Sequence, residues 1–286
     1  MLKKNNLKNI TVILPLYKTP HILIKNINQY KNLKLIILDQ SNDYKLKAKI
    51  LKQNSNIIKY IIFDKNIGFA RSCNFLLKNV KSEYCLLTQA DILINMKSIN
   101  ELLKTINKVN NCIISAPNLN KTKTIPKFSI VDSVIGANFL FDVKKMKQLK
   151  FFDEQFFLYW EDVDLCHRIK KRGYKIIIAG KAKARHLSSK SSKNDLETFF
   201  IRNINFKFGE YLYYNKINKF KKSKPLRQLL TNFIYFFINL FSLNVLKSLR
   251  NIAYIVGIFK FFFVLDYIFW KTFIYFYFLI FITPVK

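Results

Sequence analysis

The stretch ITVILPLYKTPHILIKNINQYKNLKLIILDQSN, residues 10–42, sets the pattern from which the fold can be predicted. It opens with a largely apolar run, Ile10–Leu14, which ends at Pro15 as a buried parallel strand would. A second apolar run, Leu33–Leu38, ends in the polar sequence Asp39-Gln40-Ser41-Asn42. The stretch therefore predicts two buried strands, each followed at its carboxyl end by a change of chain direction.

The same pattern continues along the chain. Helix-like spacing fills most of the segments between further apolar runs, which lie at Ile57–Phe63, Tyr84–Thr88 and Cys112–Ala116. Such alternation predicts an α/β fold with a mostly parallel, doubly wound, Rossmann-like sheet. We also expect strands at Val134–Phe141 and Tyr174–Ala179 and a mostly polar loop over the site at Asn118–Asp132.

Polar side chains follow several of the predicted strands. They are Asp39, Ser41, Asp64, Asn66 and Asp91. Any one of them can be a simple turn residue, because Asp, Asn and Ser favour turns. Ligands of doubly wound sheets bind beyond the carboxyl ends of the strands. Taken together, these side chains predict the polar rim of a ligand site.

An acidic segment, EDVDL at residues 161–165, marks the start of a predicted helix. This helix should run from Glu161 to Arg172 and stop at Gly173, a residue suited to end a helix. Carboxylates in a first turn can simply complement the helix dipole. Asp164 has a further structural use, because it can pair with Arg168 one turn later.

Asp162 is harder to explain structurally. At helical spacing it shares an apolar stripe with Leu165, Cys166 and Ile169. A carboxylate on such a face is costly unless it is paired or functional. A partly buried acid after an aromatic approach is how a general base with a raised pKa is built. Asp162 is therefore the candidate base.

The chain of 286 residues has 49 lysines and arginines against 17 acidic residues, a formal net charge of +32. Such an excess predicts attraction to nucleic acid, anionic lipid or phosphorylated substrates. The abundance of Lys, Asn, Ile and Phe also fits an AT-rich coding sequence, which raises the lysine count without selection for binding. No signal peptide is expected, because the first apolar run is too short.

The four cysteines are isolated from one another and lie in largely apolar contexts. They are Cys73, Cys85, Cys112 and Cys166. None has the spacing of a metal site. We expect them to be reduced core residues, which favours a cytosolic compartment.

From about Asp195 to the end the pattern is helical. The stretch Gln228–Leu246 is uncharged and approaches the roughly 20 residues that a membrane-spanning helix needs. Its polar residues nevertheless form one stripe, which favours a helix that lies in the membrane interface. The stripe consists of Gln228, Asn232, Tyr235, Asn239 and Ser242.

Six cations and no carboxylate lie in the basic run at residues 216–227, which precedes this stretch. A basic run beside aromatic helices fits anionic headgroups and a lipid-linked acceptor. Two alternatives stay open. One helix could span the membrane, at 228–246 or 267–285, or the helices could pack on the catalytic domain or a second subunit, which also leaves a homodimer possible.

Several motifs occur in the order found in family 2 glycosyltransferases, especially the rhamnosyltransferase-like branch, and the chain resembles that family over residues 10–186. The segments are ILPLY (13–17), LDQSND (38–43), NIGFARSCN (66–74), GANFLF (136–141), FDE (152–154) followed by Phe157 and Tyr159, EDVDL (161–165), Arg168, GY (173–174) and His186. The EDVDL segment is the most specific of these. The resemblance implies the GT-A fold.

The resemblance also implies a donor site and a metal site. The nucleotide pocket would be lined by Pro15, Tyr17, Asp39, Asn66, Gly68, Arg71 and Asp91. A divalent cation, Mg²⁺ or Mn²⁺, would be held by Asp91 and His186. Where the family often has two carboxylates, this chain has Gln89-Ala90-Asp91, with one.

The acceptor side follows from the remaining motifs. The resemblance implies that Gly136, Ala137, Tyr159 and Trp160 contact the acceptor. Asp162 would be the general base, and Glu161 and Asp164 would shape the acceptor site. The catalytic domain would cover residues 1–195, with a nucleotide-sugar half at about 1–95 and an acceptor half at about 96–195, and the C-terminal helices would cover 196–286.

The resemblance thus implies an inverting transferase that moves a sugar, rhamnose as the best candidate, from a dTDP- or UDP-sugar to a glycan or lipid-linked acceptor in cell-surface polysaccharide synthesis. We expect it at the cytoplasmic face of the inner or plasma membrane, peripheral or monotopic, without a nucleic-acid partner. The alternatives are transfer of galactofuranose, mannose or glucose on the same fold, a basic nucleic-acid-binding protein, and an inactive scaffold.

Overall fold

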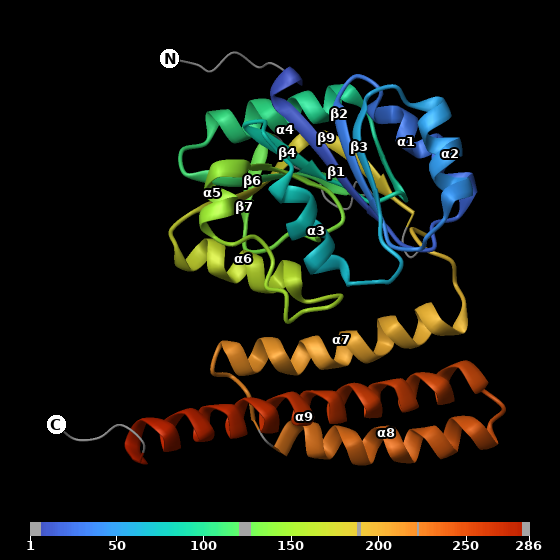
Figure 1. Ribbon diagram of the computed structural model, residues 1–286, viewed down its shortest axis with the longest axis vertical. Helices are drawn as coiled ribbons and strands as arrows, with labels where there is room; N and C mark the ends of the chain where they lie inside the picture. The colour runs from blue at the N-terminus through green and yellow to red at the C-terminus, as the bar shows by residue number, and fades with distance from the viewer. Residues whose placement is uncertain (1–6, 120–126, 188–189, 222, 282–286) are drawn as a thin grey trace. The chain divides into compact units, whose positions relative to one another are not determined.

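The computed structural model of the protein describes residues 7–119, 127–187, 190–221 and 223–281, with side chains up to residue 265. The chain divides into two compact units, Met1–Asp195 and Leu196–Lys286. The first unit contains the sheet, and the second is helical (Figure 1).

The first unit is built on a nine-stranded sheet in the order β3-β2-β1-β4-β8-β6-β9-β5, with β7 paired to β9. The strands are β1 (Ile10–Leu16), β2 (Lys34–Asp39), β3 (Ile57–Ile62), β4 (Tyr84–Leu87), β5 (Ile92–Ile94), β6 (Cys112–Leu119), β7 (Phe128–Val131), β8 (Phe139–Asp142) and β9 (Lys175–His186). Strands β1 to β4 are mutually parallel where they pair, and β6 pairs parallel with β9. The carboxyl ends of these strands therefore meet at one edge.

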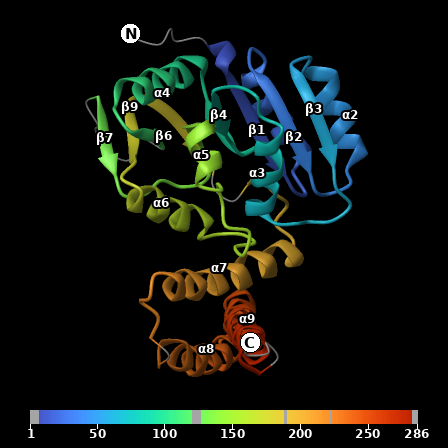
Figure 2. The same ribbon diagram turned by 60° about the vertical axis from the view of Figure 1, so that its left-hand side comes forward.

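Helices cover both faces of the sheet. They are α1 (Ile24–Ile27), α2 (Tyr44–Gln53), α3 (Phe69–Lys78), α4 (Met96–Lys108), α5 (Val143–Gln148) and α6 (Glu161–Lys171), with short 3₁₀ turns at Leu7–Asn9, His21–Leu23 and Asn28–Tyr30. One core joins alternate residues of β1, such as Val12, to α2 and α4. A second core joins Ile13 and its neighbours to α3, α5 and α6 (Figure 2). This confirms the predicted doubly wound sheet.

The predicted strands are confirmed as β1, β2, β3, β4 and β6, but β3 lies at the edge of the sheet and, unlike the other four, has no buried residue. The helix predicted from Glu161 is also confirmed as α6, and Gly173 follows it with a φ of +73°. All four cysteines are free and buried, as expected.

Two strand predictions are wrong. The strand expected at Val134–Phe141 is only β8, which begins at Phe139, because the Gly136 N–H bonds to the Asp162 side chain and not to a neighbouring strand. The segment Asn118–Asp132 is not all loop. Its first two residues belong to β6, residues 120–126 lie outside the described residues, and β7 pairs with the start of β9.

The last strand is longer than predicted. The expected segment Tyr174–Ala179 continues to His186, because the later half of β9 pairs with β5 on one side and β6 on the other. His186 is therefore the final residue of a strand, and its side chain is only 17% exposed.

The second unit contains three long helices, as predicted from Asp195 onward. They are α7 (Leu196–Lys216), α8 (Ser223–Phe241) and α9 (Val245–Phe281). Within the described residues, α9 holds the one segment that is long and apolar enough to cross a membrane, Val245–Leu265, with a mean hydropathy of 1.6. This segment differs from the suggested span 228–246, and the other suggested span, 267–285, lies outside the residues whose side chains are described.

Candidate active site

Asp39 ends β2 and is fully buried at the polar edge of the sheet. The Ser41 N–H donates to Asp39 Oδ1 at 2.9 Å, and the Tyr60 hydroxyl donates to Oδ2 at 3.2 Å. Burial raises the pKa of Asp39, although these hydrogen bonds oppose the shift. The carboxylate is held in a fixed position, as an acceptor for a ligand N–H or O–H group must be.

Pro15 and Tyr17 lie beside this carboxylate, as the resemblance implied. Leu16, between them, is directly opposite Asp39 in the parallel pairing of β1 and β2. Pro15 and Tyr17 are both half-buried. These two residues and Asp39 thus line one end of the sheet edge.

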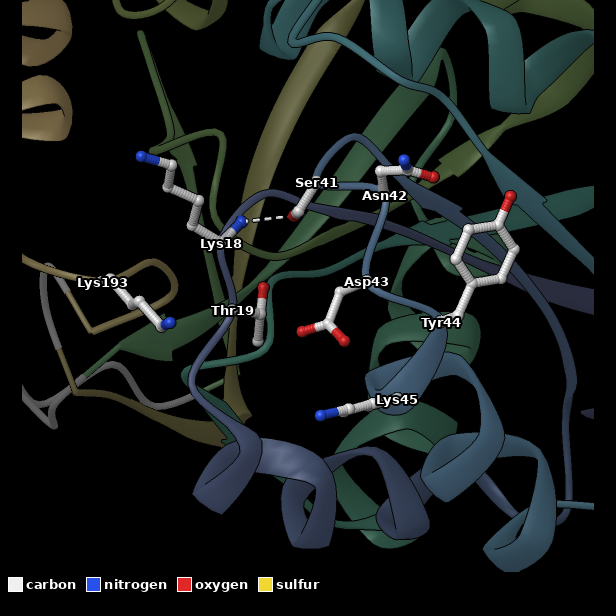
Figure 3. A pocket seen from close by; sticks show the side chains of 8 residues that line it. All are labelled: Lys18, Thr19, Ser41, Asn42, Asp43, Tyr44, Lys45 and Lys193. Carbon is white, nitrogen blue, oxygen red and sulfur yellow. Dashed lines mark hydrogen bonds between the residues drawn. The ribbon is translucent and has the colours of Figure 1, made fainter.

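A cavity of about 430 Å³ opens next to them (Figure 3). It is lined by Lys18, Thr19, Ser41, Asn42, Asp43, Tyr44, Lys45 and Lys193. The Lys18 N–H donates to Ser41 Oγ at 2.6 Å, which joins the loop after β1 to the loop after β2. Three lysines and one aspartate give the cavity a positive balance, which suits an anionic ligand.

Sequence reasoning missed the lysines of this cavity. Lys18 comes two residues after the end of β1 and could have been found as a residue near a strand end. Lys193 could not, because it comes from the segment after β9, where its N–H donates to the Lys18 carbonyl at 2.8 Å. Thr19 fixes the same segment by donating to the Ser191 carbonyl at 3.0 Å.

Asn66 and Gly68 organise the loop before α3. Asn66 Oδ1 accepts from the Gly68 N–H at 2.9 Å, and Gly68 has a φ of +92°. A Cβ at Gly68 would stand 2.6 Å from the Phe157 carbonyl oxygen, so only glycine fits. Gln40 Oε1 accepts from the Ile67 N–H at 2.9 Å and ties this loop to the end of β2.

Arg71 lies on α3 away from this hydrogen-bonded loop. Its side chain is 58% exposed and approaches Glu154 at 3.9 Å. The same helix is held by Asn74, which exchanges two hydrogen bonds with the backbone of Phe152 at 2.9 and 3.1 Å. The NIGFARSCN and FDE motifs are therefore bound to each other, and the recorded partner of Arg71, Glu154, lies in the FDE motif.

Asp91 and His186 come together at the other end of the edge. Asp91 follows β4 and is fully buried, and its Oδ2 lies 3.4 Å from His186 Nε2 and accepts from the Lys190 N–H at 3.1 Å. Burial alone would raise the pKa of Asp91, but the hydrogen bond and charge of His186, with the Lys190 N–H, hold it below its usual value. The carboxylate is therefore kept ionised.

The second carboxylate oxygen of Asp91, Oδ1, is buried and has no hydrogen-bond partner among the described residues. An ionised oxygen with one imidazole nitrogen beside it fits a divalent cation, because Mg²⁺ is commonly held by one or two carboxylates together with substrate phosphates. No group of three or more metal-binding side chains occurs in the described part of the chain.

Asp162 and Gly136 meet at the start of α6. The Gly136 N–H donates to Asp162 Oδ2 at 2.7 Å, and the Val163 N–H donates to Oδ1 at 2.8 Å. A Cβ at Gly136 would lie 3.2 Å from the Asp162 Cβ, so a larger residue would displace the carboxylate. Burial raises the pKa of Asp162 and the backbone N–H groups oppose the shift. The side chain is only half-buried, so a ligand can reach it.

Glu161 and Asp164 have different environments in the same helical turn. Glu161 is buried, and its Oε2 accepts no hydrogen bond among the described residues. Burial, and then the charge of Asp162, raise the pKa of Glu161 well above its usual value. Asp164 is buried against Arg168 at 2.7 Å, which confirms the ion pair suggested by the spacing. Arg168 also donates to the Leu149 and Phe151 carbonyls, so Asp164 holds α6 to that turn.

Tyr159 and Trp160 lead into α6 in an unusual conformation. Both are half-buried, with φ values of +68° and +71°. Two consecutive left-handed residues that are not glycine cost conformational energy, and such strain concentrates at functional sites. Ala137 is buried beside Gly136. Gly136 contacts Asp162, and Tyr159 and Trp160 directly precede α6 in the chain. That these four residues contact an acceptor stays a prediction.

Asn138 connects the acceptor side to β4 and was not anticipated. Its Nδ2 donates to Thr88 Oγ1 at 3.0 Å and to the Leu87 carbonyl at 3.3 Å, and Thr88 shares a hydrogen bond of 2.7 Å with the Tyr30 hydroxyl. Thr88 lies three residues before Asp91 in the chain. This network therefore fixes the segment that contains Gly136 relative to the segment that contains Asp91.

Comparison with known proteins gives two family matches. The sequence model described as glycosyl transferase family 2 matches residues 11–168, and that described as glycosyl transferase family group 2 matches residues 111–283. No curated protein matches the chain in sequence.

Solved structures with a similar fold include two glycosyltransferases. One is a crystal structure of GalNAc-T7 with UDP, GalNAc and Mn²⁺, at 13% identity and a TM-score of 0.54 over 71% of this chain and 48% of that one. The other is the mannosyltransferase PcManGT from Pyrobaculum calidifontis in complex with GDP-Man and Mn²⁺, at 14% identity and a TM-score of 0.56 over 75% of this chain and 65% of that one. This chain spans less than two thirds of either. The similarity confirms the GT-A fold.

Proposed function

Because the chain belongs to glycosyl transferase family 2, we propose that it moves a sugar from a nucleotide-diphosphate sugar to a glycan or lipid-linked acceptor, with inversion at the anomeric carbon. The observation that carries this proposal is the position of Asp162. Its two oxygens are held by backbone N–H groups, its pKa is raised by burial, and its side chain remains accessible.

Asp162 acts as the general base in this proposal. It accepts the proton of an acceptor hydroxyl as that oxygen bonds to the anomeric carbon, on the face opposite the leaving group. The bond between the anomeric carbon and the phosphate oxygen breaks, and its electron pair leaves with the nucleoside diphosphate. One displacement inverts the configuration. The Gly136 and Val163 N–H groups orient the carboxylate throughout.

Asp91 and His186 would hold a divalent cation, Mg²⁺ or Mn²⁺. When bound, the cation neutralises charge on the donor diphosphate and its leaving group. The unpaired buried oxygen of Asp91 supports this assignment, as do the Mn²⁺ ions in both similar solved structures. Because the motif has a single carboxylate, the donor phosphates would have to supply further ligands.

The donor occupies the edge formed by Asp39, Pro15 and Tyr17 and the basic cavity beside them. A buried carboxylate can accept hydrogen bonds from a base or ribose, and the lysines suit phosphate. We propose a dTDP- or UDP-sugar, with rhamnose as the transferred sugar on the strength of the FDE and EDVDL motifs. Galactofuranose, mannose and glucose are the competing sugars on the same fold.

The proposed location is the cytoplasmic face of the inner or plasma membrane, where the enzyme serves cell-surface polysaccharide synthesis. The basic run at 216–227 and the aromatic helices after it support this. A homodimer is compatible with the same helices.

The test is a panel of nucleotide-sugars screened for thermal stabilisation of the full-length protein with Mn²⁺ and with EDTA, since a ligand that binds only the folded state raises the melting temperature. We expect one dTDP- or UDP-sugar to stabilise the protein in Mn²⁺ and its nucleoside diphosphate to appear when acceptor is added. Stabilisation by duplex DNA and by no nucleotide-sugar would instead identify a nucleic-acid-binding protein. Donor binding without turnover on any acceptor would identify an inactive scaffold.

A further inference from the structure

The polar stripe of helix α8 meets α7 at Gln228. Gln228 Oε1 accepts hydrogen bonds from Lys207 Nζ at 3.1 Å and from the Tyr211 hydroxyl, both on α7. Asn232 and Asn239 donate to backbone carbonyls one turn earlier, at 2.8 and 2.7 Å. These three amides are half-buried. At these three positions the stripe that the sequence assigned to a membrane interface is partly shielded within the unit, whereas its Tyr235 is 54% exposed.

An ion cluster fixes this orientation. Glu210 of α7 accepts from Lys207 at 2.7 Å and from Lys224, in the first turn of α8, at 3.0 Å. The Glu210 and Lys207 side chains are only 12% and 10% exposed. Because one carboxylate binds a cation from each helix, α8 cannot rotate to present Gln228 outward without breaking the cluster.

The opposite side of α8 is apolar and exposed. Leu230, Phe233, Ile234, Phe237 and Phe241 all expose large parts of their side chains, and Phe241 is 81% exposed. No charged residue follows Arg227 in this helix. Polar side chains lie inside and apolar ones outside, the reverse of a helix on the surface of a water-soluble protein.

The first part of α9 extends the same surface. Val256, Phe259 and Phe263 are exposed, while Ala253, Ile258 and Phe261 are buried. An apolar hollow of about 690 Å³ lies between α8 and α9, with Phe233 and Phe259 in its lining. We call the exposed apolar side chains of α8 and of Val245–Leu265 the apolar outer face.

We propose that the apolar outer face lies in the hydrocarbon of a lipid bilayer, at the depth of the acyl chains. Polar groups turned inward and apolar groups outward are the arrangement that a lipid environment favours. The segment Val245–Leu265 is also long and apolar enough to cross a membrane. This inference concerns the second unit alone and does not depend on the proposed transferase activity.

Cations at both ends of the hairpin formed by α8 and α9 favour lipid over a second protein chain as the partner of the apolar outer face. Lys221, Lys224 and Arg227 precede the uncharged part of α8, and Lys247 and Arg250 follow the turn after it. Cations that flank an apolar stretch match anionic headgroups. A second copy of the chain would cover one strip, whereas exposed apolar residues occur at consecutive positions, such as Phe233-Ile234 and Phe237-Ile238.

The inference is tested by placing an environment-sensitive fluorophore on the full-length protein at Phe233→Cys, with Ile58→Cys on β3 as the matched control. Both positions are 56% exposed. The four native cysteines are buried and stay unlabelled in the folded protein. Vesicles of phosphatidylcholine and phosphatidylglycerol carry bromine either near the headgroups or deep in the acyl chains.

We expect vesicles to shift the emission of the Phe233→Cys label to the blue and deep bromine to quench it most, with neither effect at Ile58→Cys. A label that stays in water when vesicles are present overturns the inference. So does a label that is already shielded without lipid in a protein that sediments as a dimer, because the face is then covered by a second copy.

Charge substitution gives an independent readout. Phe233→Glu should weaken vesicle binding roughly tenfold or more, because a carboxylate is costly in hydrocarbon, and Ile58→Glu should not. Nucleotide-sugar stabilisation of both variants, measured without vesicles, reports on the first unit and on folding. If a folded Phe233→Glu variant binds vesicles as well as the wild type does, the inference is contradicted. If neither the wild type nor any variant binds the donor, only the proposed function is contradicted.

Discussion

Asp91 and Asp162 are the same residue type in two different settings of the first unit, and their pKa values are shifted in opposite directions. Asp91 is buried beside His186, which keeps its pKa low, and its Oδ1 has no hydrogen-bond partner among the described residues. Asp162 has both oxygens on backbone N–H groups and no cation beside it among its recorded partners, so burial raises its pKa.

This difference assigns two chemical roles. A carboxylate that stays ionised and has an unused buried oxygen is suited to hold a cation against a diphosphate. A carboxylate with a raised pKa and an accessible side chain is suited to take a proton. Because both residues are aspartates, their hydrogen-bond and charge partners decide which of the two roles each one has.

Removing the base tests the comparison most severely. Asp162→Asn keeps the size of the side chain but cannot accept the acceptor proton, so the transfer rate should fall by ~10²–10⁴-fold. Donor affinity should stay near the wild-type value. Steady-state rates and nucleotide-sugar titrations measure both, and near-normal turnover would remove Asp162 from the role of base.

A neighbouring carboxylate sharpens the comparison, because Asp164 lies in the same turn but is paired with Arg168. Asp164→Ala should lower the free energy of unfolding by about 3 kcal/mol, the lower end of the range for breaking a buried pair, since Arg168 is partly exposed and keeps two carbonyl partners. Urea unfolding measures this loss. When it is measured at temperatures far below the melting temperature of the variant, donor affinity should be unchanged. A variant that is as stable as the wild type but has no turnover would give Asp164 a catalytic role instead.

Asp91→Asn should weaken donor binding in Mn²⁺ by roughly 10–100-fold, because the amide removes the charge of the one carboxylate in the metal motif. Thermal stabilisation by the donor, measured against Mn²⁺ concentration, should show that the variant needs far more metal. Equal stabilisation of wild type and variant across the Mn²⁺ series would remove Asp91 from the metal site.

The smallest expected effect concerns the buried Glu161. Its pKa is raised in the folded protein, so the wild type should lose stability as the pH rises from the usual value of 4.5 toward the raised one, where the folded state must ionise a buried group. Glu161→Gln cannot ionise and should flatten this decline. Urea unfolding at about pH 5 and about pH 8 measures the two slopes, and equal slopes would show that burial does not control Glu161.

The raised pKa of Asp162 also sets the acidic limb of the rate profile. The base must be ionised, so transfer should fail on the acid side at a higher pH than an ordinary aspartate would give. The profile of kcat/KM against pH checks this.

Continuous apolar runs made the central strands predictable. Buried parallel strands such as β1 and β2 need apolar residues on both faces, and the sequence has them. Strand β7 was missed because it lies at the margin of the sheet, where Phe128 and Ile130 are exposed and burial imposes no such pattern. The end of β9 was missed although it was predictable, because its exposed lysines alternate with buried alanines as in a half-buried strand.

Site residues that belong to a sequence motif or a helical pattern could be predicted. Residues that reach the site only through contacts between distant segments could not. Asp162 could be found from helical spacing, but Lys193 and Asn138 reach the site only through contacts made in the fold. Helix α8 shows the same limit. Periodicity indicates which residues share a face, but the contact of Gln228 with α7 decides which way that face points.

The division of labour between Asp91 and Asp162 is tested most directly by calorimetric titration of the nucleotide-sugar identified by the screen into wild type, Asp91→Asn and Asp162→Asn, each in Mn²⁺ and in EDTA. The account predicts that Asp162→Asn keeps both the affinity and the metal dependence of the wild type. Asp91→Asn in Mn²⁺ should bind no better than the wild type in EDTA. Metal-dependent binding that survives in Asp91→Asn and disappears in Asp162→Asn would contradict the account.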